Sequence, residues 1–248
     1  MKYDSSYLLV LSSPRKNYFL LDPNFPARLL NSGKERTVEF IDLLFEDYSK
    51  RGLTESTDRR LAASGLESRI ARALPCNNSR YGIFQDYLHR NLLWQASDGK
   101  TEPIEYKDHR VPSWSWMSCS RGITFVDIEV GSVSWVSSLT FDDERESALI
   151  ADVGELQNCT MKPEGDRYAV FHSFGRDIGW VQYDHESGKE NHEIRCVVVG
   201  RIEGSVAKEY YYVLVVVPTR EDGEYRRVGL GMVPTGSIEW LRAGVRIV

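Results

Sequence analysis

The spacing of apolar residues changes near residue 110, and this change divides the chain into two regions. In residues 37–109 apolar positions recur every three or four residues, which is the period of an amphipathic helix. In residues 110–248 apolar and polar residues tend to alternate, which is the period of a half-buried strand. The pattern predicts an α+β protein with an N-terminal helical region packed on a C-terminal antiparallel β sandwich or partly open barrel. Residues 1–36 form an extension before the first clear period.

Three helices are expected in the N-terminal region. The first ends at Gly52, which is free to turn left-handed after a cationic last turn. The second opens at Asp58, an N-cap candidate, and Gly65 weakens its middle. The third ends at Trp94. The apolar positions assigned to these helices are Val38, Ile41, Leu44, Phe45 and Tyr48, then Leu61, Leu66 and Ile70, then Tyr81, Phe84, Leu88 and Leu92.

The strand candidates of the C-terminal region are rich in Val, Ile, Tyr and Trp, and the breaks between them carry turn residues. They lie at 133–136, 148–153, 168–171, 180–183, 193–199, 210–217 and 225–233. The strongest turn signal is Asp222-Gly223, because it stands between two apolar runs and therefore predicts a β-hairpin.

One short stretch, RVPSWSWMS, holds two of the six tryptophans, Trp114 and Trp116. Pro112 cannot donate a ladder hydrogen bond, so it belongs at the first residue of a strand. Residues two apart in a strand share a face, so the indoles would lie together and Ser113 and Ser115 would lie opposite. Burying one Trp removes roughly 200 Å² from water. We therefore expect the pair to be core residues between helices and sheet. An aromatic platform for a ligand or partner is the alternative.

Composition and charge exclude several classes of function. The 248 residues are 42% hydrophobic and 27% charged, with a formal net charge of −5, as in an ordinary globular protein. An acidic chain offers no basic face to nucleic acid. No apolar run is long enough to span a bilayer, so neither nucleic acid nor a membrane is an expected partner. The N-terminus lacks the pattern of a secretory signal, and a cytoplasmic location is expected.

No catalytic motif is present: the sequence has no HExxH, no GxSxG and no Walker A loop. Asp184, His185 and His192 flank a turn that is expected to be solvated rather than metal-bound. The four cysteines are too far apart for a zinc or redox CxxC motif, and reduced thiols are expected. They are Cys76, Cys119, Cys159 and Cys196. We therefore expect no catalytic residue, no metal and no cofactor.

An alternative hypothesis pairs Cys119 with His109 as nucleophile and base. Trp114 and Trp116 would complete a pocket at the junction of helices and sheet. The protein would then be a small-molecule hydrolase or a ligand sensor.

A series of short motifs resembles one protein family. In order, the sequence shows YSKRGLT (48–54), DRRLAASG (58–65), LLW (92–94) and RVPSWSWMS (110–118). This series resembles the "YS.R.LT", "D.L.A.SG", "LLW" and "R.PSWSWAS" motifs of fungal heterokaryon-incompatibility domain proteins, downstream of their signature domain. GWVQYD (179–184), YYVL (211–214) and YRRVGLG (225–231) are also similar to C-terminal strands of that family. The residues assigned a structural role in these motifs are Asp58, Gly65, Trp94, Pro112, Ser113, Trp114, Ser115 and Trp116.

The resemblance covers about residues 37–233 and implies a role in non-self recognition and cell death when incompatible fungal cells fuse. The family's N-terminal α/β domain is similar to Toll/interleukin-receptor-type folds and carries "YxxLSYCWG" and "RxWTxQE" motifs. Neither motif is found in this sequence. The chain is therefore expected to be the downstream accessory region, as a truncated family member or a fragment, with residues 1–36 an extension or a remnant of the upstream domain. The expected function is a non-catalytic interaction module that binds a protein partner.

Overall fold

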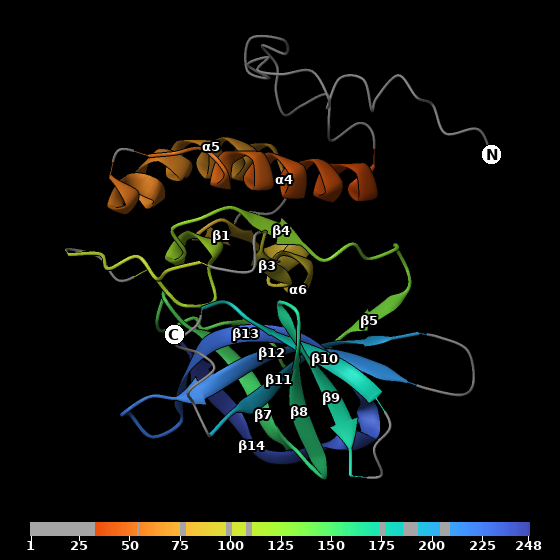
Figure 1. The fold of residues 1–248 in the computed structure, drawn as a ribbon. Helices are drawn as coiled ribbons and strands as arrows, with labels where there is room; N and C mark the ends of the chain where they lie inside the picture. The colour runs from red at the N-terminus through yellow and green to blue at the C-terminus, as the bar shows by residue number, and fades with distance from the viewer. Residues whose placement is uncertain are drawn as a thin grey trace.

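The computed structural model describes residues 33–53, 55–74, 78–97, 101–107, 111–173, 177–185, 193–203 and 209–248. Within these ranges the protein is α+β, with three α-helices, one large mixed sheet of ten strands, and two small sheets, β1-β2 and β3-β4. Figure 1 shows three layers: the two long helices on one side, short elements in the middle, and the large sheet on the other side.

The helices are α4 (Lys34–Ser49), α5 (Arg59–Ala73) and the single turn α6 (Leu88–Asn91). Short 3-10 turns are η1 (Ser56–Asp58), η2 (Gln85–Tyr87), η3 (Trp116–Ser118) and η5 (Thr235–Ser237). The minor strands are β1 (Ser79–Arg80), β2 (Ile83–Phe84), β3 (Trp94–Ala96), β4 (Ile123–Phe125), β5 (Val133–Trp135) and β6 (Thr140–Phe141). The longer strands are β7 (Leu149–Leu156), β8 (Cys159–Glu164), β9 (Arg167–His172), β10 (Asp177–Tyr183), β11 (Arg195–Ile202), β12 (Tyr210–Pro218), β13 (Glu224–Pro234) and β14 (Ile238–Ile247).

Helix α5 buries two of its three predicted core residues, Leu66 and Ile70, and exposes the third, Leu61. Its buried positions are Arg59, Ala63, Leu66 and Ile70, whose spacing of four, three and four residues follows the helical period. Leu61 lies off this stripe and is 77% exposed, so its assignment to the core is wrong. Leu61 is exposed because the buried stripe begins at Arg59 and does not include position 61. The Arg59 guanidinium holds this face inward by donating to the Ser49 and Ser120 carbonyls.

The start and middle of α5 also differ from expectation. Asp58 is the last residue of η1, and its side chain makes no capping hydrogen bond to α5. Its backbone N–H instead donates to the Glu55 carbonyl at 3.1 Å. Gly65 is exposed on α5, with no neighbouring atom within 4 Å of the position that a Cβ would take.

The predicted third helix is replaced by a hairpin and a single helical turn. Strands β1 and β2 pair antiparallel around Tyr81 and Gly82, which have φ angles of 52° and 78°. Two positive φ values in a two-residue loop are typical of a type I′ turn. A Cβ on Gly82 would lie 2.6 Å from the Trp116 indole nitrogen, so this close contact also requires glycine. Helix α6 is only four residues long, and Trp94 lies in β3.

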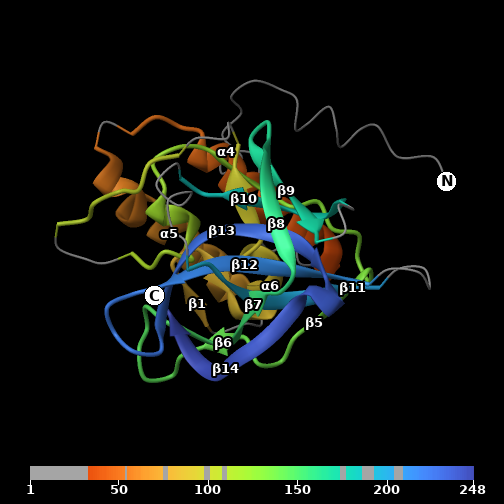
Figure 2. The ribbon, with the colours of Figure 1, turned by 60° about the horizontal axis from the view of Figure 1, so that its bottom comes forward.

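The large sheet contains a closed ring of five strands. In the order β12-β11-β7-β14-β13 each strand pairs with the next, and β13 pairs with β12 to close the ring. Strands β10, β9 and β8 continue from β13 as an extension (Figure 2). The pairings are antiparallel except for β13–β14, which is parallel, so the predicted antiparallel domain is a mixed sheet. The predicted hairpin joins β12 to β13, and Gly223 in its turn has a φ of 74°.

One hydrophobic cluster contains residues of both halves of the chain. It includes Phe45 of α4, Ile70 of α5, Trp94 of β3 and Leu149 of β7. A second cluster, formed mainly by valines of the strands, includes Val181 and Val215.

Candidate functional site

The PSWSW segment is not a strand. The Ser115 N–H donates to the Pro112 carbonyl at 3.1 Å, and the Ser118 N–H donates to the Ser115 carbonyl at 3.0 Å. The Ser115 hydroxyl accepts from the Met117 N–H at 3.1 Å and so caps η3. A serine side chain that bonds the backbone two residues on favours a turn over a ladder, and the predicted extended segment is therefore wrong.

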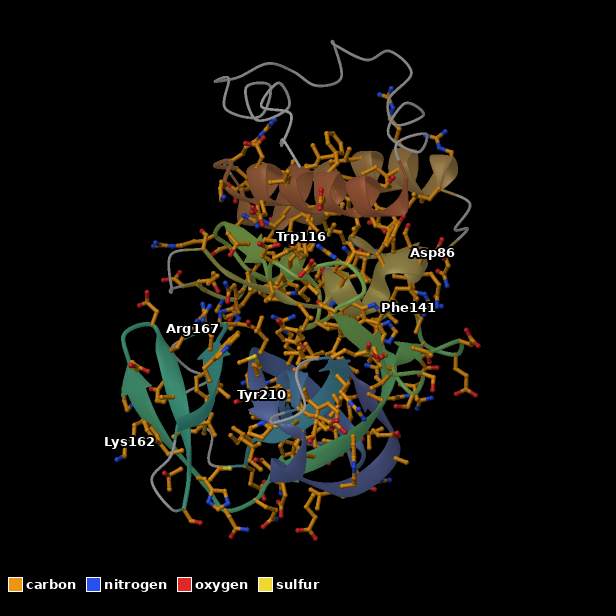
Figure 3. All side chains as sticks on the ribbon, turned by 90° about the vertical axis from the view of Figure 1, so that its right-hand side faces the viewer. Asp86, Trp116, Phe141, Lys162, Arg167 and Tyr210 are labelled. Carbon is orange, nitrogen blue, oxygen red and sulfur yellow. The ribbon has the colours of Figure 1, made fainter. Side chains whose placement is uncertain are left out.

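Both indoles of the segment are fully buried, with different neighbours. The Trp114 ring lies 5.7 Å from the Tyr81 ring and is nearly perpendicular to it. The Trp116 ring lies 5.1 Å from the Phe45 ring of α4, beneath the helical layer (Figure 3). Because no part of either indole reaches solvent, the pair does not form an exposed aromatic platform.

The two serines of the segment bond to distant parts of the chain. The Ser113 hydroxyl donates to the Val248 carbonyl and accepts from the Arg227 N–H at 2.8 Å. The Ser115 hydroxyl donates to the Tyr81 carbonyl at 2.7 Å. The segment therefore joins the β1–β2 hairpin to β13.

A buried arginine, Arg227 of β13, lies at the centre of these contacts. Its Nε and Nη2 donate to the two carboxylate oxygens of Asp184 at 2.9 and 3.1 Å. Its Nη1 donates to the Leu92 carbonyl at 2.6 Å, and Nη2 also donates to the Trp94 carbonyl at 2.5 Å. The guanidinium carbon lies 3.6 Å from the centroid of the Trp94 ring, in cation–π contact. We call Arg227 and these partners the Arg227 network.

The Arg227 network was not predicted from the sequence. The one available signal is a charged residue inside an apolar strand, because Arg227 precedes the run Val228 to Val233. Its side chain is 0% exposed and that of Asp184 is 3% exposed, so the ion pair is dry. A buried arginine keeps its charge only when acceptors surround it, and here a bidentate carboxylate and two carbonyls do so.

The thiol of the alternative pocket meets a different histidine from the one predicted. His109 lies outside the described residues. Cys119 Sγ lies 3.9 Å from His185 Nε2. The Thr101 hydroxyl donates to the Asp184 carbonyl at 2.5 Å and lies 2.8 Å from His185 Nδ1. Because the Thr101 hydroxyl donates its hydrogen to the Asp184 carbonyl, it accepts from His185 Nδ1, and Nε2 is the ring nitrogen that faces the thiol.

This contact is not that of an activated nucleophile. Burial first, and then the charge of Asp184, raise the pKa of the Cys119 thiol to about 12. Cys119 is 0% exposed, and neither surface cavity described below is lined by it. A thiol in this environment stays protonated at neutral pH, and only the thiolate is a strong nucleophile.

Two surface cavities lie away from Cys119. The Trp135 pocket has a volume of about 160 Å³ and is lined by Val38, Asp86, Tyr87, His89, Arg90, Glu129, Val130, Gly131, Val133 and Trp135. The second cavity is a groove of about 610 Å³ beside the PSWSW segment, lined by both basic and acidic side chains, among them Arg145, Arg220, Glu221, Glu224 and Arg226.

The described residues form neither a metal-binding cluster nor a membrane-spanning helix. No three His, Cys, Asp or Glu side chains of these residues come together in a way that could hold a metal ion. His192, in the turn that the sequence suggested, lies outside them. No helix of the described ranges combines the length and the apolar character needed to cross a bilayer.

Comparison of the chain with protein-family models, with curated proteins and with solved structures found no match.

Proposed function

We propose that this chain is a non-catalytic interaction module, the accessory region of a heterokaryon-incompatibility-type protein that acts in fungal non-self recognition and cell-death signalling. One observation carries the proposal: segments that provide the resemblance meet in the buried Arg227 network. LLW contributes the Leu92 and Trp94 carbonyls, PSWSW contributes the Ser113 hydroxyl, GWVQYD contributes Asp184, and YRRVGLG contributes Arg227 itself.

The geometry of this network supports a scaffold rather than a reaction centre. In an active site, charged groups and hydrogen-bond donors converge on a space that substrate can enter. The donors of the Arg227 guanidinium end instead on protein acceptors, and the side chains of the ion pair are at most 3% exposed. Buried residues of this kind stabilise the shape of the protein surface, and the surface binds the protein partner.

The proposal treats the two long helices and the segment that contains Trp116 as one packed unit. Phe45 of α4 contacts Trp116, and Arg59 of α5 donates to the Ser120 and Arg121 carbonyls at 2.9 and 3.1 Å. A partner that binds to this unit would then meet a preorganised surface, which lowers the entropy lost on binding.

One observation favours the second candidate, a small-molecule hydrolase or ligand sensor. The His185 imidazole lies between the Cys119 thiol and the Thr101 hydroxyl. A nucleophilic triad has the same order: a nucleophile, a base and a group that orients the base. The thiol would have to become exposed and lose its proton before it could react. Its burial and its pKa of about 12 both oppose this.

Hydrolysis assays separate the two candidates. Purified protein is incubated with activated esters and with NAD, beside a heat-denatured control and the Cys119→Ser variant. We expect no turnover above the denatured control, because the thiol stays protonated and covered. Turnover that disappears in Cys119→Ser would establish the second candidate instead.

A domain exchange tests the binding function itself. In fungal cells, the downstream region of a full-length heterokaryon-incompatibility protein is replaced by residues 33–248 of this chain, which keep α4 whole, or by an unrelated β domain. We expect the first fusion alone to restore incompatibility-dependent cell death and to co-purify with the same protein as the intact relative. Equal behaviour of the two fusions would refute the proposal.

A further inference from the structure

The Trp135 pocket is surrounded by exposed apolar side chains. Val130 is 47% exposed and Trp135 is 39% exposed, and both line the cavity together with Val133 and with Val38 of α4. Strand β5, which carries Trp135, pairs only with β11 among the described strands. Exposed large apolar residues around a concave site are typical of a place where another molecule binds.

The histidine of this pocket brings an acceptor rather than a positive charge. His89 Nε2 lies 2.6 Å from the Val136 carbonyl, and a carbonyl only accepts, so Nε2 carries the hydrogen. Burial lowers the pKa of His89, so the ring is neutral at pH 7 and Nδ1 has a free lone pair. The ring also stacks on Trp135, with 5.8 Å between the ring centroids.

The charges of the lining are mainly negative. Asp86 and Glu129 are exposed, and neither carboxylate forms an ion pair with a described residue. Asp86 lies at the outer edge of the middle layer (Figure 3). Arg90 is the one cation of the lining, and its Nε lies 3.6 Å from Asp42 Oδ2. The pocket therefore combines an aromatic ring, apolar walls, two exposed carboxylates and the Arg90 guanidinium, which lies beside Asp42.

We propose that the Trp135 pocket binds a basic side chain, lysine or arginine, of the protein partner. The aliphatic stem of that side chain packs on the valines and beside the exposed part of the Trp135 indole, and its charged head lies between Asp86 and Glu129. The inference rests on the proposed binding function and specifies the chemistry of the partner. An apolar residue fits less well, because it would remove water from both carboxylates without pairing them. An acidic or phosphorylated residue would be repelled by them.

The test uses small probes in place of the partner. The indole N–H signal of Trp135, assigned with Trp135→Phe, is followed by ¹H–¹⁵N NMR during titration with Nα-acetyl-lysine methylamide. The arginine analogue and the neutral norleucine analogue are titrated in parallel. We expect saturable shifts with the basic probes, with a Kd on the order of 1–10 mM for so small a ligand. The tighter of the two basic probes identifies the side chain.

Two double variants with the same change in net charge complete the experiment. Asp86→Asn/Glu129→Gln should weaken binding of the basic probes at least about fivefold. Glu164→Gln/Asp166→Asn should leave binding of the basic probes unchanged, because Glu164 and Asp166 lie in the β8–β9 hairpin. Figure 3 labels Lys162 and Arg167 of this hairpin on the opposite side of the molecule from Asp86.

Three results would overturn the inference: no shift of the Trp135 signal, equal binding of the norleucine probe, or equal weakening in both double variants. Each would leave the proposed function to be judged by the domain exchange, because the probe titration does not involve the partner.

Discussion

Replacement of Arg227 by methionine tests directly how much the Arg227 network contributes to the stability of the fold. Methionine fills a similar volume but donates no hydrogen bond, so Asp184 keeps a buried charge without its partner. The Leu92 and Trp94 carbonyls lose their donors at the same time. Removing one member of a buried ion pair costs about 3–5 kcal/mol. Each buried carbonyl left without a donor costs about 1–3 kcal/mol more, although such losses do not add in full. We expect Arg227→Met to lose at least about 3–5 kcal/mol, a large share of the roughly 5–15 kcal/mol that stabilises a domain.

Urea unfolding followed by tryptophan fluorescence and far-UV circular dichroism measures this loss. With an m-value near 3 kcal/mol per M, the midpoint should fall by about 1–2 M. Arg226→Met is the matched control, because Arg226 is an exposed neighbour on the same strand, and it should change stability by less than about 0.5 kcal/mol. Arg227→Met/Asp184→Leu removes the orphaned charge and should recover part of the loss.

Two outcomes would refute this reasoning. If Arg227→Met unfolds at the same urea concentration as Arg226→Met, the network does not stabilise the fold. If the double variant is no more stable than Arg227→Met, the unpaired Asp184 charge is not the source of the loss.

Three further predictions follow from buried groups. Trp116→Ala should lose about 3–5 kcal/mol, because its indole is fully buried against Phe45, and calorimetry that shows a wild-type melting temperature would contradict this. Burial outweighs the Arg90 guanidinium and raises the pKa of Asp42 from 3.8 to about 7. Stability from protonated Asp42 is therefore fully present below about pH 4 and is lost as the pH rises through 7. Asp42→Asn should flatten that part of the stability–pH curve in urea titrations, and an unchanged slope would count against it. Cys119, whose pKa is raised to about 12, should resist iodoacetamide at pH 8 until urea unfolds the protein, whereas peptide mass spectrometry that finds native labelling would show an open site.

The strands were predicted where Val, Ile, Tyr and Trp are concentrated between turn residues, as in β12, which has five consecutive buried residues. The seven strand candidates all correspond to strands of the sheet, and the Asp222-Gly223 turn joins β12 to β13. β14 was missed because six consecutive residues, from Glu239 to Gly244, are exposed and its pairing with β7 is irregular, so no alternation shows in the sequence. β8 was missed because four of its six residues are exposed, and Pro163 argues against a strand.

The candidate site was less predictable because its contacts join residues far apart in the chain. Arg227 bonds Asp184 across 43 residues and Leu92 across 135 residues, and no local period reports such a pair. The helical pattern around Tyr81 was misleading for a local reason, because Gly82 turns the chain back at a positive φ. The choice of His109 as the partner of Cys119 relied on closeness in sequence, whereas the fold brings His185 to the thiol.

The long sequence separations within the Arg227 network have a consequence for synthesis of the protein. Leu92 and Trp94 are synthesised more than 130 residues before Arg227, whose guanidinium donates to their carbonyls. At about 5–20 residues per second, a stretch of 135 residues takes roughly 7–27 s to translate. During that interval the N-terminal half has apolar surface, including the Trp94 ring, that Arg227 of β13 is not yet present to cover. The nascent chain is therefore a natural client for a chaperone that binds until the last strands emerge.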